Sequence, residues 1–453
     1  MRHRLAVSLT LLVMSLLIGC GRMPGIPTTR GAAAIAKANG VPGAEQPFPK
    51  GFLWGVATAG YQYEGNDTTS NWATWEAQGR AKEKSGVAID HYRRFGEDLD
   101  LTRSLGLNAF RMSLEWSRIE PVRGQIDRDA LAHYHAVIDN ALARGLTPVV
   151  TLSHFSYPAW LDAPLGGGPG GWESAETLVE FRRFAALAAR EFGSQVQYWI
   201  TLNEPNTLAI NGYLLGIFPP GKRNPLAYRT VLDRMVLAHR LAYAELHAVR
   251  PDAKVSLNPF IFTQRKSAEV TAEGFNPDDT ALLDGAMGRG AASGSPTLDF
   301  VAFDYYYPVS PQDLPEIPHH DQWSVYPEGM YWVCKELYGR YKLPLFIAEN
   351  GMATSGDRPR EDHWTRSAFL VNHVAHLRRA MAEGIPVLGY MHWSLVDNYE
   401  WGTFEPRFGL FAIDRRDPSL TRMRTEACDT YQAIATANGL TPALIDRYLG
   451  KRQ

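Results

Sequence analysis

The stretch Trp199–Asn206, "WITLNEPN", indicates most directly how this chain folds. Its first four residues are apolar or β-branched, a composition that favours a β-strand. The run then meets Asn203, Glu204 and Pro205, and a proline does not continue a central strand. Glu204 is therefore predicted to stand at the tip of a buried strand, either as a solvated turn residue or as a group held in place for chemistry.

The chain repeats this arrangement from Phe48 onward. Short apolar runs alternate with segments of helical period, which is typical of a parallel sheet wrapped in helices. Good helical segments are 130–145, 177–193, 228–250 and 363–384, each ending in a glycine or followed by a proline. The predicted strands are 52–59, 107–114, 147–154, 196–204, 253–259, 298–306, 344–349 and 386–394.

Eight strands with intervening helices predict an α/β fold, a single (β/α)8 TIM barrel without a second domain. The interval between Asn258 and Leu298 is longer than the others and is predicted to hold either a helix or an extended loop. Chain length agrees with one barrel, since barrels with insertions reach the 453 residues of this chain.

Composition excludes two broad classes of protein. The net charge is only −2, so nothing in the composition indicates the basic face that a nucleic-acid partner requires, and no such partner is expected. Hydrophobic residues make up 45% and charged residues 21%, which supports a large core and argues against disorder. The 12 Trp and 20 Tyr also suit a sugar site, because pyranose C–H faces pack on aromatic rings.

The N-terminus resembles a bacterial lipoprotein signal. A basic segment, "MRHR", precedes the apolar run Leu5–Ile18, which is too short for a comfortable transmembrane helix. The run closes on "LIGC", so residues 1–19 are predicted to be a signal peptide and Cys20 the lipidated mature N-terminus. An ordinary cleaved signal or an uncleaved anchor are the alternatives. The expected location is outside the cytoplasm, lipid-anchored to the cell envelope and facing the periplasm or the cell surface.

Residues 20–46 are rich in Gly, Pro and Ala without periodicity, so they are predicted to be a flexible tether ahead of a barrel domain at 47–453. Cys334 and Cys428 lie far apart and in no spaced pattern, which favours two buried free thiols over a disulfide. His319 and His320 have no third ligand spaced nearby, so a solvated loop is predicted there and no metal site.

Polar or aromatic residues occupy the carboxyl end of nearly every predicted strand, which is the end of a (β/α)8 barrel that carries active sites. Glu204 and Glu349 are the strongest pair, since each ends an apolar strand and is followed by turn residues. Two neighbouring carboxyl groups suit acetal hydrolysis, in which one is protonated to help the leaving oxygen depart and the other is ionised. Their repulsion raises the pKa of one carboxyl and leaves the other low.

Five motifs in order resemble glycoside hydrolase family 1, the β-glucosidase-type retaining enzymes. They are "FLWGVATAGYQYEG" (52–65), "FRMSLEWSRIEP" (110–121), "TLSH" (151–154), "NEP" (203–205) with "ENG" (349–351), and "HWSLVDNYEW" (392–401) with "RFGLFAID" (407–414). The resemblance runs from about residue 48 to about residue 435. The family fold is a (β/α)8 barrel, in agreement with the strand count.

The resemblance implies a role for each matching position. Glu204 matches the acid/base and Glu349 the nucleophile, while Arg111 and Tyr306 match the groups that hold the nucleophile in place and ionised. The residues that match the sugar-binding positions are Gln62, His154, Asn203, Glu400 and Trp401, with Trp393 as a stacking floor. Glu120, Asp397 and Asp414 lie in the same motifs and are expected to be structural.

The implied activity is retaining hydrolysis of terminal β-linked sugars through a covalent glycosyl-enzyme intermediate, without a metal or organic cofactor. The expected partner is a small β-glycoside or oligosaccharide. Glucose, galactose and fucose differ at O4 and O6, where Gln62, Glu400 and Trp401 tolerate several arrangements, so the motifs favour a β-glucosidase but leave the sugar open. They also leave open the aglycone and the oligomeric state.

The chain departs from the family pattern at three places. Asp304 stands where the family usually has asparagine, which adds a third carboxyl near the pair, and we expect it to face the leaving-group side and alter the pH profile. Phe155 follows His154 where the family has tryptophan, which removes an indole donor. The loop after Trp401 looks shorter than usual, which leaves the aglycone preference open.

Three alternatives fit the same sequence less well. A 6-phospho-β-glycosidase needs a phosphate-binding Ser and Lys beyond the eighth strand, where Glu400 would instead repel phosphate. A transglycosylase would share every motif and would differ in the acceptor. A catalytically silent sugar-binding lipoprotein would typically lose one carboxylate, and this chain keeps both Glu204 and Glu349.

Overall fold

Eight parallel strands build the central barrel of the computed structural model, which describes residues 40–261, 277–289, 294–307, 323–356 and 358–449. The strands are β1 (Leu53–Ala57), β2 (Ala109–Ser113), β3 (Thr147–Ser153), β4 (Tyr198–Asn203), β5 (Lys254–Asn258), β6 (Val301–Asp304), β7 (Leu345–Asn350) and β9 (Val387–His392). The predicted (β/α)8 barrel is confirmed, and every predicted strand is present with slightly different limits.

Hydrogen bonds close the sheet into a barrel. Its order is β5-β4-β3-β2-β1-β9-β7-β6, and every neighbouring pair is parallel. The two end strands then meet around Asp304, whose backbone N–H donates to Pro259 O at 3.1 Å and whose carbonyl accepts from Ile261 N at 3.0 Å. The carboxyl ends of β5 and β6 are therefore fixed side by side.

The strand bodies are buried because a parallel sheet is covered on both faces. Trp199 and Ile200 of β4 and Val149 and Val150 of β3 are all fully buried. This burial is the physical reason for the continuous apolar runs that predict the strands.

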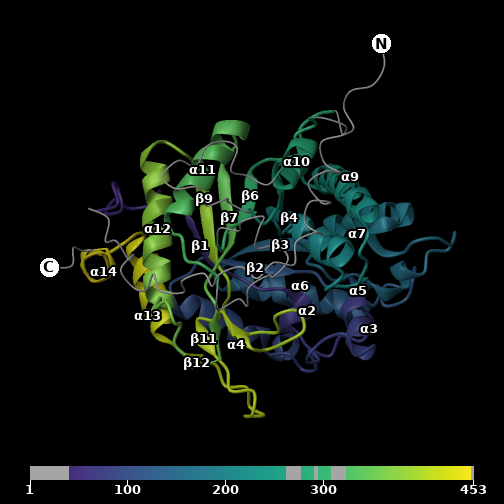
Figure 1. Cartoon of the computed structure of the whole chain (residues 1–453), viewed down its shortest axis with the longest axis horizontal. Helices are drawn as coiled ribbons and strands as arrows, with labels where there is room; N and C mark the ends of the chain where they lie inside the picture. Colours follow the sequence, from purple (N-terminus) through teal and green to yellow (C-terminus); the bar gives the residue numbers. More distant parts are fainter. Residues whose placement is uncertain (1–39, 262–276, 290–293, 308–322, 357, 450–453) are drawn as a thin grey trace, which may run out of the picture. The chain divides into compact units, whose positions relative to one another are not determined.

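Helices surround the barrel (Figure 1), with α9 against β4 and β5, α6 against β3, and α11 against β7. Their starts follow from capping residues: the Asp127 side chain accepts from two backbone N–H groups of α6, and Asn224 does so for α9, which has Pro225 in its first turn.

The helices are α2 (Gly60–Tyr63), α3 (Asn71–Ala77), α4 (His91–Ser104), α5 (Trp116–Ile119), α6 (Arg128–Ala143), α7 (Ala175–Phe192), α8 (Pro205–Ala209), α9 (Pro225–Val249), α10 (Pro277–Ala286), α11 (Glu328–Tyr341), α12 (Arg366–Ala382), α13 (Glu426–Ala437) and α14 (Pro442–Tyr448), with shorter turns η1 (Ala159–Asp162), η2 (Gly171–Glu173) and η3 (Ile210–Leu214).

The four helical segments predicted from the sequence correspond to α6, α7, α9 and α12 and are confirmed. The interval between β5 and β6 contains α10, so the helix alternative is correct there for the part that the structure describes. Four two-residue strands were not predicted, since segments this short carry no periodicity. They are β8 (Thr354–Ser355), β10 (Pro406–Arg407), β11 (Phe411–Ala412) and β12 (Met423–Arg424), paired antiparallel as β8 with β10 and β11 with β12.

The last residues of the predicted tether belong to the packed domain. Val41 and Ala44 are buried, and the Gln46 side-chain oxygen accepts from Arg378 Nη2 on α12 at 2.6 Å. The domain therefore begins before the predicted limit at residue 47, because two apolar side chains in this segment find a surface to cover. The predicted signal peptide (1–19), Cys20 and the start of the tether lie outside the described residues.

Cys334 and Cys428 are buried free thiols, as predicted. His319 and His320 lie outside the described residues. Within the part of the chain that the structure describes, no helix has both the length and the apolar character needed to cross a membrane.

Candidate active site

The carboxyl ends of the barrel strands bring the predicted site residues together. Arg111 lies on β2, Asn203 ends β4 and Glu349 lies near the end of β7. His154, Glu204, Tyr306 and Trp393 follow within two residues of a strand end, whereas Gln62 lies on α2 and Glu400 and Trp401 lie in the loop after β9. The set is largely buried, since only Trp401 among these residues is half-buried. The buried ones are Gln62, Arg111, His154, Asn203, Glu204, Tyr306, Glu349, Trp393 and Glu400.

Glu204 is held at the tip of β4 by its backbone. It adopts a left-handed conformation, with φ 38° and ψ 57°, which costs a non-glycine residue of order 1–3 kcal/mol. Its N–H donates to Asn258 O on β5 at 2.8 Å, and Pro205 opens α8 directly after it. The strained turn therefore ends the strand and fixes where the carboxyl begins.

Glu349 is held by a cation and a phenol. Arg111, which is fully buried, donates from Nη1 to Glu349 Oε1 at 2.5 Å. Tyr306 donates from its hydroxyl to Oε2 of the same carboxylate at 2.6 Å. Each oxygen thus receives a hydrogen bond that favours the ionised form, and the charge-assisted ones are the stronger kind.

The two glutamates form one cluster with Asp304. A carboxyl oxygen from each of Glu204, Asp304 and Glu349 lies within 4.8 Å of one from each of the others. Retaining glycosidases hold their two carboxyl groups about 5–5.5 Å apart, whereas inverting ones leave about 6.5–9.5 Å for a water molecule. The spacing in this site is that of the retaining geometry.

Burial and neighbouring charges act differently on the pKa values of the two glutamates. Burial, followed by the charge of Glu349, raises the pKa of Glu204 to about 8. Burial also raises the pKa of Glu349, but Arg111 and the Tyr306 phenol oppose that rise. The arrangement therefore favours a protonated Glu204 beside an ionised Glu349, as an acid and a nucleophile require.

The Asn203 amide links the catalytic cluster to a histidine. Its Oδ1 accepts from Arg111 Nη2 at 2.5 Å and from Asn258 Nδ2 at 2.8 Å, so its Nδ2 is the donor toward His154 Nε2 at 3.2 Å. The ring proton of His154 then sits on Nδ1, which has no hydrogen-bond partner among the described residues. Burial and the Arg111 charge lower the pKa of His154, so a neutral ring offers this N–H to a ligand.

Glu400 anchors a second group of polar side chains. Its carboxylate accepts from Trp393 Nε1 at 3.1 Å and from Gln62 Nε2 at 3.2 Å, and burial raises its pKa to about 8. The side-chain oxygen of Gln62 is buried without a partner in the described part of the chain. A buried acceptor of this kind is left for a hydroxyl group of a ligand.

Aromatic rings border these polar groups. The His154 ring stacks near the indoles of Trp393 and Trp401, with ring centroids 5.9 Å from each and nearly parallel planes. Phe155, where the resemblance predicts an indole, packs against Trp401 at 5.0 Å. The phenyl ring keeps the apolar contact and provides no N–H donor.

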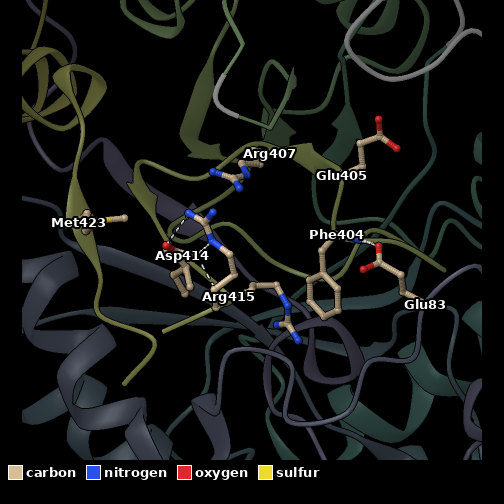
Figure 2. A pocket seen from close by; sticks show the side chains of 9 residues that line it. Glu83, Phe404, Glu405, Arg407, Asp414, Arg415 and Met423 are labelled. Carbon is tan, nitrogen blue, oxygen red and sulfur yellow. Dashed lines mark hydrogen bonds and ion pairs between the residues drawn. The ribbon is translucent and has the colours of Figure 1, made fainter. Parts of the chain in front are cut away.

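The loop after Trp401 is fixed by contacts to a distant segment (Figure 2). The Glu83 carboxylate accepts from Thr403 Oγ1 at 2.7 Å and from Phe404 N at 2.8 Å. The Arg415 guanidinium covers the Phe404 ring, 3.3 Å from its centroid. These contacts hold the loop that presents Trp401 to the site.

Asn258 is a site residue that the sequence analysis missed. Its Nδ2 donates both to Asn203 Oδ1 at 2.8 Å and to Asp304 Oδ2 at 2.5 Å, and it is fully buried. The signal was present, since "SLNP" ends the fifth strand with an asparagine as "TLNE" ends the fourth. A lone asparagine before a proline more commonly marks a turn, so this pattern alone does not predict a site residue at Asn258.

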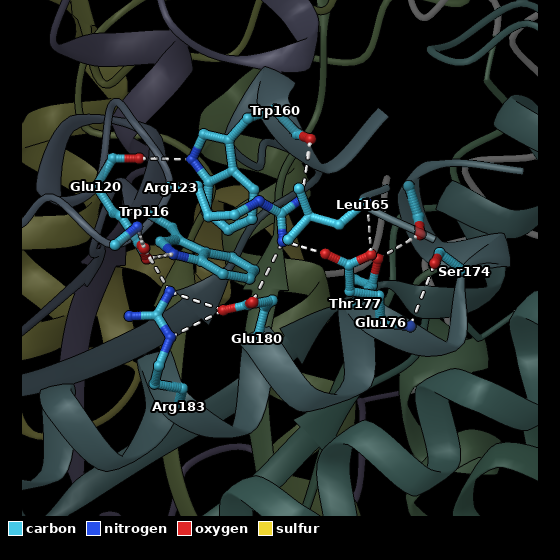
Figure 3. A network of polar contacts seen from close by, with 12 residues as sticks. Trp116, Glu120, Arg123, Trp160, Leu165, Ser174, Glu176, Thr177, Glu180 and Arg183 are labelled. Carbon is cyan, nitrogen blue, oxygen red and sulfur yellow. Dashed lines mark hydrogen bonds and ion pairs between the residues drawn. The ribbon is translucent and has the colours of Figure 1, made fainter. Parts of the chain in front are cut away.

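Glu120 belongs to a structural network outside this cluster (Figure 3). Its carboxylate accepts from Trp116 Nε1 at 3.0 Å and from Gly124 N at 2.6 Å, and it pairs with Arg183 of α7. Its backbone carbonyl accepts from Trp160 Nε1 at 2.9 Å. With its oxygens engaged in this way, Glu120 ties the segment after α5 to α7, in agreement with the structural role predicted for it.

Asp397 and Asp414 also make local structural contacts. Asp397 Oδ1 accepts from Gly409 N at 2.9 Å, which joins the segment after β9 to the one after β10. Asp414 pairs with Arg416 at 2.8 Å on the surface. Both contacts fix the course of the chain around them, as expected for structural residues.

Comparison with known proteins matches this chain to one family. The model of glycosyl hydrolase family 1 matches residues 44–271 and 297–440. Among curated relatives, β-glucosidase A of Thermotoga maritima is 31% identical over 87% of this chain and 98% of the relative.

Solved structures agree in fold. A β-glucosidase from Thermotoga maritima in complex with galacto-hydroximolactam superimposes with a TM-score of 0.77 at 30% identity, covering 87% of this chain and all of that one. A β-glycosidase from Pyrococcus horikoshii gives a TM-score of 0.76 at 31% identity, over 90% of this chain and 99% of that one. The similarity thus extends over the whole barrel.

Proposed function

Because this chain belongs to glycosyl hydrolase family 1, and is therefore a glycoside hydrolase, we propose that it acts as a retaining β-glucosidase with Glu204 as acid/base and Glu349 as nucleophile. The observation that carries the assignment is the placement of the two buried carboxyl groups within 4.8 Å of each other, with only Glu349 hydrogen-bonded to Arg111 and Tyr306 among the described residues. This spacing is shorter than that of inverting enzymes and suits direct attack by a carboxylate.

In the first step, Glu349 attacks the anomeric carbon of the bound β-glycoside. The bond from that carbon to the aglycone oxygen breaks, and the departing oxygen takes the proton of Glu204. The products are a glycosyl ester of Glu349, a free aglycone and an ionised Glu204. A protonated Glu204 at neutral pH follows from its raised pKa, about 8.

In the second step, Glu204 reverses its role. It removes a proton from a water molecule, whose oxygen attacks the anomeric carbon from the face that the aglycone left. The ester bond breaks, Glu349 regains its negative charge next to Arg111, and Glu204 regains its proton. Two inversions at one carbon retain the β-configuration, and the site returns to its starting protonation state.

The remaining residues suit recognition of a neutral sugar. Gln62 and Glu400 offer a buried acceptor and a carboxyl to neighbouring hydroxyl groups, His154 offers an N–H, and Trp393 offers an aromatic face. The names of the relatives favour glucose, and a β-glucosidase is the assignment that they support. Substrates are small β-glycosides or oligosaccharide fragments with a terminal sugar.

The test is turnover of 4-nitrophenyl β-glucoside, with galactoside and fucoside in parallel and Glu349→Ala as the control. We expect wild-type turnover to exceed that of Glu349→Ala by several orders of magnitude, because the nucleophile is lost. Proton NMR of the first product should show the β-anomer. Equal turnover by both proteins, or release of the α-anomer first, would refute the proposal.

We further propose that the enzyme is a lipoprotein exported to the cell envelope, anchored through Cys20 and facing the periplasm or the cell surface. The support is the "LIGC" motif after a short basic segment and the apolar run Leu5–Ile18. Labelling with a fatty acid should modify the wild type and not Cys20→Ala, with Cys334→Ala as the control. Equal labelling of wild type and Cys20→Ala would refute the anchor and leave the glycosidase assignment untouched.

A further inference from the structure

Asp304 is a buried acid that the reaction steps above do not use. It ends β6, is fully buried, and accepts at Oδ2 a hydrogen bond from Asn258 Nδ2 at 2.5 Å. Its Oδ1 is buried without a hydrogen-bond partner among the described residues. A buried carboxyl oxygen in this state is stabilised when the group carries a proton or shares one.

Glu204 provides the partner for such a proton. A carboxyl oxygen of Glu204 lies within 4.8 Å of one of Asp304, and both side chains are buried. Two carboxylates at this distance in a buried site repel each other strongly, so the pair tends to retain one proton between them. We propose that Asp304 shares a proton with Glu204, so that the two carboxyl groups ionise as a pair and the acid form of Glu204 persists to higher pH.

The surrounding charges allow this sharing. Arg111, the cation beside the cluster, is hydrogen-bonded to Glu349 and Asn203, so neither member of the pair has it as a direct partner in the described structure. Burial and the charge of Glu349 raise the pKa of Asp304 well above its usual range. The groups that face the pair are Arg111 from β2, the neutral His154 after β3, Thr207 from α8, Asn258 from β5, Tyr306 after β6 and Glu349 from β7.

The shared proton affects both steps of the reaction described under the proposed function, and this inference rests on that proposed function. Before the first step, it keeps a proton available at a pH where an isolated Glu204 would be ionised more often. In the second step Glu349 is esterified and neutral, so a negative charge on Asp304 replaces the one that Glu349 has lost. That charge keeps the proton affinity of Glu204 high while it removes a proton from water. Asp304 is thus a positioning residue for the proton and does not touch the sugar.

The test compares the pH dependence of kcat/KM for 4-nitrophenyl β-glucoside in the wild type, Asp304→Asn and Asp304→Ser. In both variants the alkaline limb should move to lower pH by roughly 1–2 units, because the last proton of the pair is no longer held against the charge of a second carboxylate. The acid limb, which reports Glu349, should move less. Asp304→Asn keeps the shape and the hydrogen-bonding capacity of the side chain, and Asp304→Ser covers the case in which the amide disturbs folding.

Asp397→Asn is the matched control, because it neutralises another buried acid with a raised pKa that lies outside the cluster. Its alkaline limb should coincide with that of the wild type. If Asp304→Asn or Asp304→Ser is active and its curve coincides with the wild-type curve, this inference is overturned while the proposed function stands. If the wild type turns over no faster than Glu349→Ala at any pH, the proposed function fails and this inference falls with it.

Discussion

Arg111 and Glu349 are joined by a hydrogen bond of 2.5 Å between Nη1 and Oε1, inside a site where both side chains are buried. The other nitrogens of the guanidinium donate to neutral oxygens, those of Asn203 and Thr151 among them. Of the two catalytic glutamates, Arg111 therefore hydrogen-bonds only to Glu349 in the part of the chain that the structure describes. This asymmetry assigns the ionised role to Glu349 and leaves the proton-carrying role to Glu204.

Tyr306→Phe should raise the pKa of Glu349, because the phenol donates to the ionised carboxylate at 2.6 Å. Glu349 must be ionised to attack, so the acid limb of kcat/KM against pH should move to higher pH. A hydrogen bond to a charged group contributes about 1.5–3 kcal/mol, so kcat/KM at neutral pH should fall roughly 10- to 100-fold.

Tyr305→Phe is the matched control for this change. The Tyr305 hydroxyl donates to Tyr326 O at 2.8 Å, away from the glutamates. The acid limb of kcat/KM against pH should stay at the wild-type position in Tyr305→Phe. An unchanged acid limb in Tyr306→Phe as well would contradict the role given to the phenol.

Glu204→Ala should discriminate between leaving groups. A dinitrophenolate departs without a proton, so the first step should survive with a dinitrophenyl β-glucoside. An alkyl β-glucoside needs the proton, and its kcat/KM should fall by about 10²–10⁴-fold. Added azide should restore turnover of the activated substrate by attacking the ester in place of activated water. Equal losses on both substrates, with no effect of azide, would remove Glu204 from the acid/base role.

Glu400→Gln should weaken sugar binding, because Oε1 accepts from Trp393 and Oε2 accepts from Gln62, and the substitution replaces one of these two oxygens with an N–H group. The loss of such a buried contact corresponds to roughly a 10- to 100-fold fall in kcat/KM. Glu405→Gln, in the same loop but exposed and paired with Lys82, should change kcat/KM little. Steady-state kinetics on the β-glucoside compares them, and similar values for both variants would contradict the binding role of Glu400.

Asp98→Asn should destabilise the fold without involving the site. Asp98 is fully buried and binds His91 Nδ1 at 2.7 Å and Arg422 Nε at 2.9 Å. Removing one partner of a buried pair lowers the free energy of unfolding by about 3–5 kcal/mol. Asp100→Asn, on the same helix and exposed in its pair with Arg144, should lower it by less than about 1 kcal/mol.

The effect of Asp98→Asn should depend on pH. Burial alone would raise the pKa of Asp98, but His91 and Arg422 lower it below the usual value. A lowered folded pKa means that the group stabilises the fold above the unfolded pKa, and that this contribution is lost as pH falls through the folded pKa. Denaturant unfolding should therefore show the full difference at neutral pH and a smaller one below about pH 4. A difference that is constant with pH would contradict the ion-pair account.

The barrel and its catalytic pair could be predicted from the sequence for physical reasons. Strands that are buried on both faces must be continuously apolar, so eight apolar runs in the sequence predict the eight strands. At the strand tips, Glu204 and Glu349 interrupt that pattern, and a charged group at the end of a buried strand needs a partner. Arg111 was predicted in the same way, because its charge interrupts the apolar run of the second predicted strand.

Other parts of the site depend on contacts between distant segments, which no local pattern reveals. Asn258 takes its importance from the meeting of β4, β5 and β6. The left-handed turn at Glu204 occurs together with a backbone hydrogen bond to Asn258 at the end of β5. The packing of Val41 against the domain depends on a surface that the folded chain creates. Each of these features is decided by tertiary structure rather than by local propensity.

The measurement that tests the central claim most directly is the identification of the carboxyl group that forms the glycosyl ester. Incubation with a 2-deoxy-2-fluoro-β-glucoside bearing an activated leaving group should slow the second step and let the ester accumulate. After digestion at low pH, mass spectrometry should locate the sugar on the peptide that contains Glu349. A sugar found instead on Glu204 or Asp304, or full inactivation without any labelled peptide, would contradict the account.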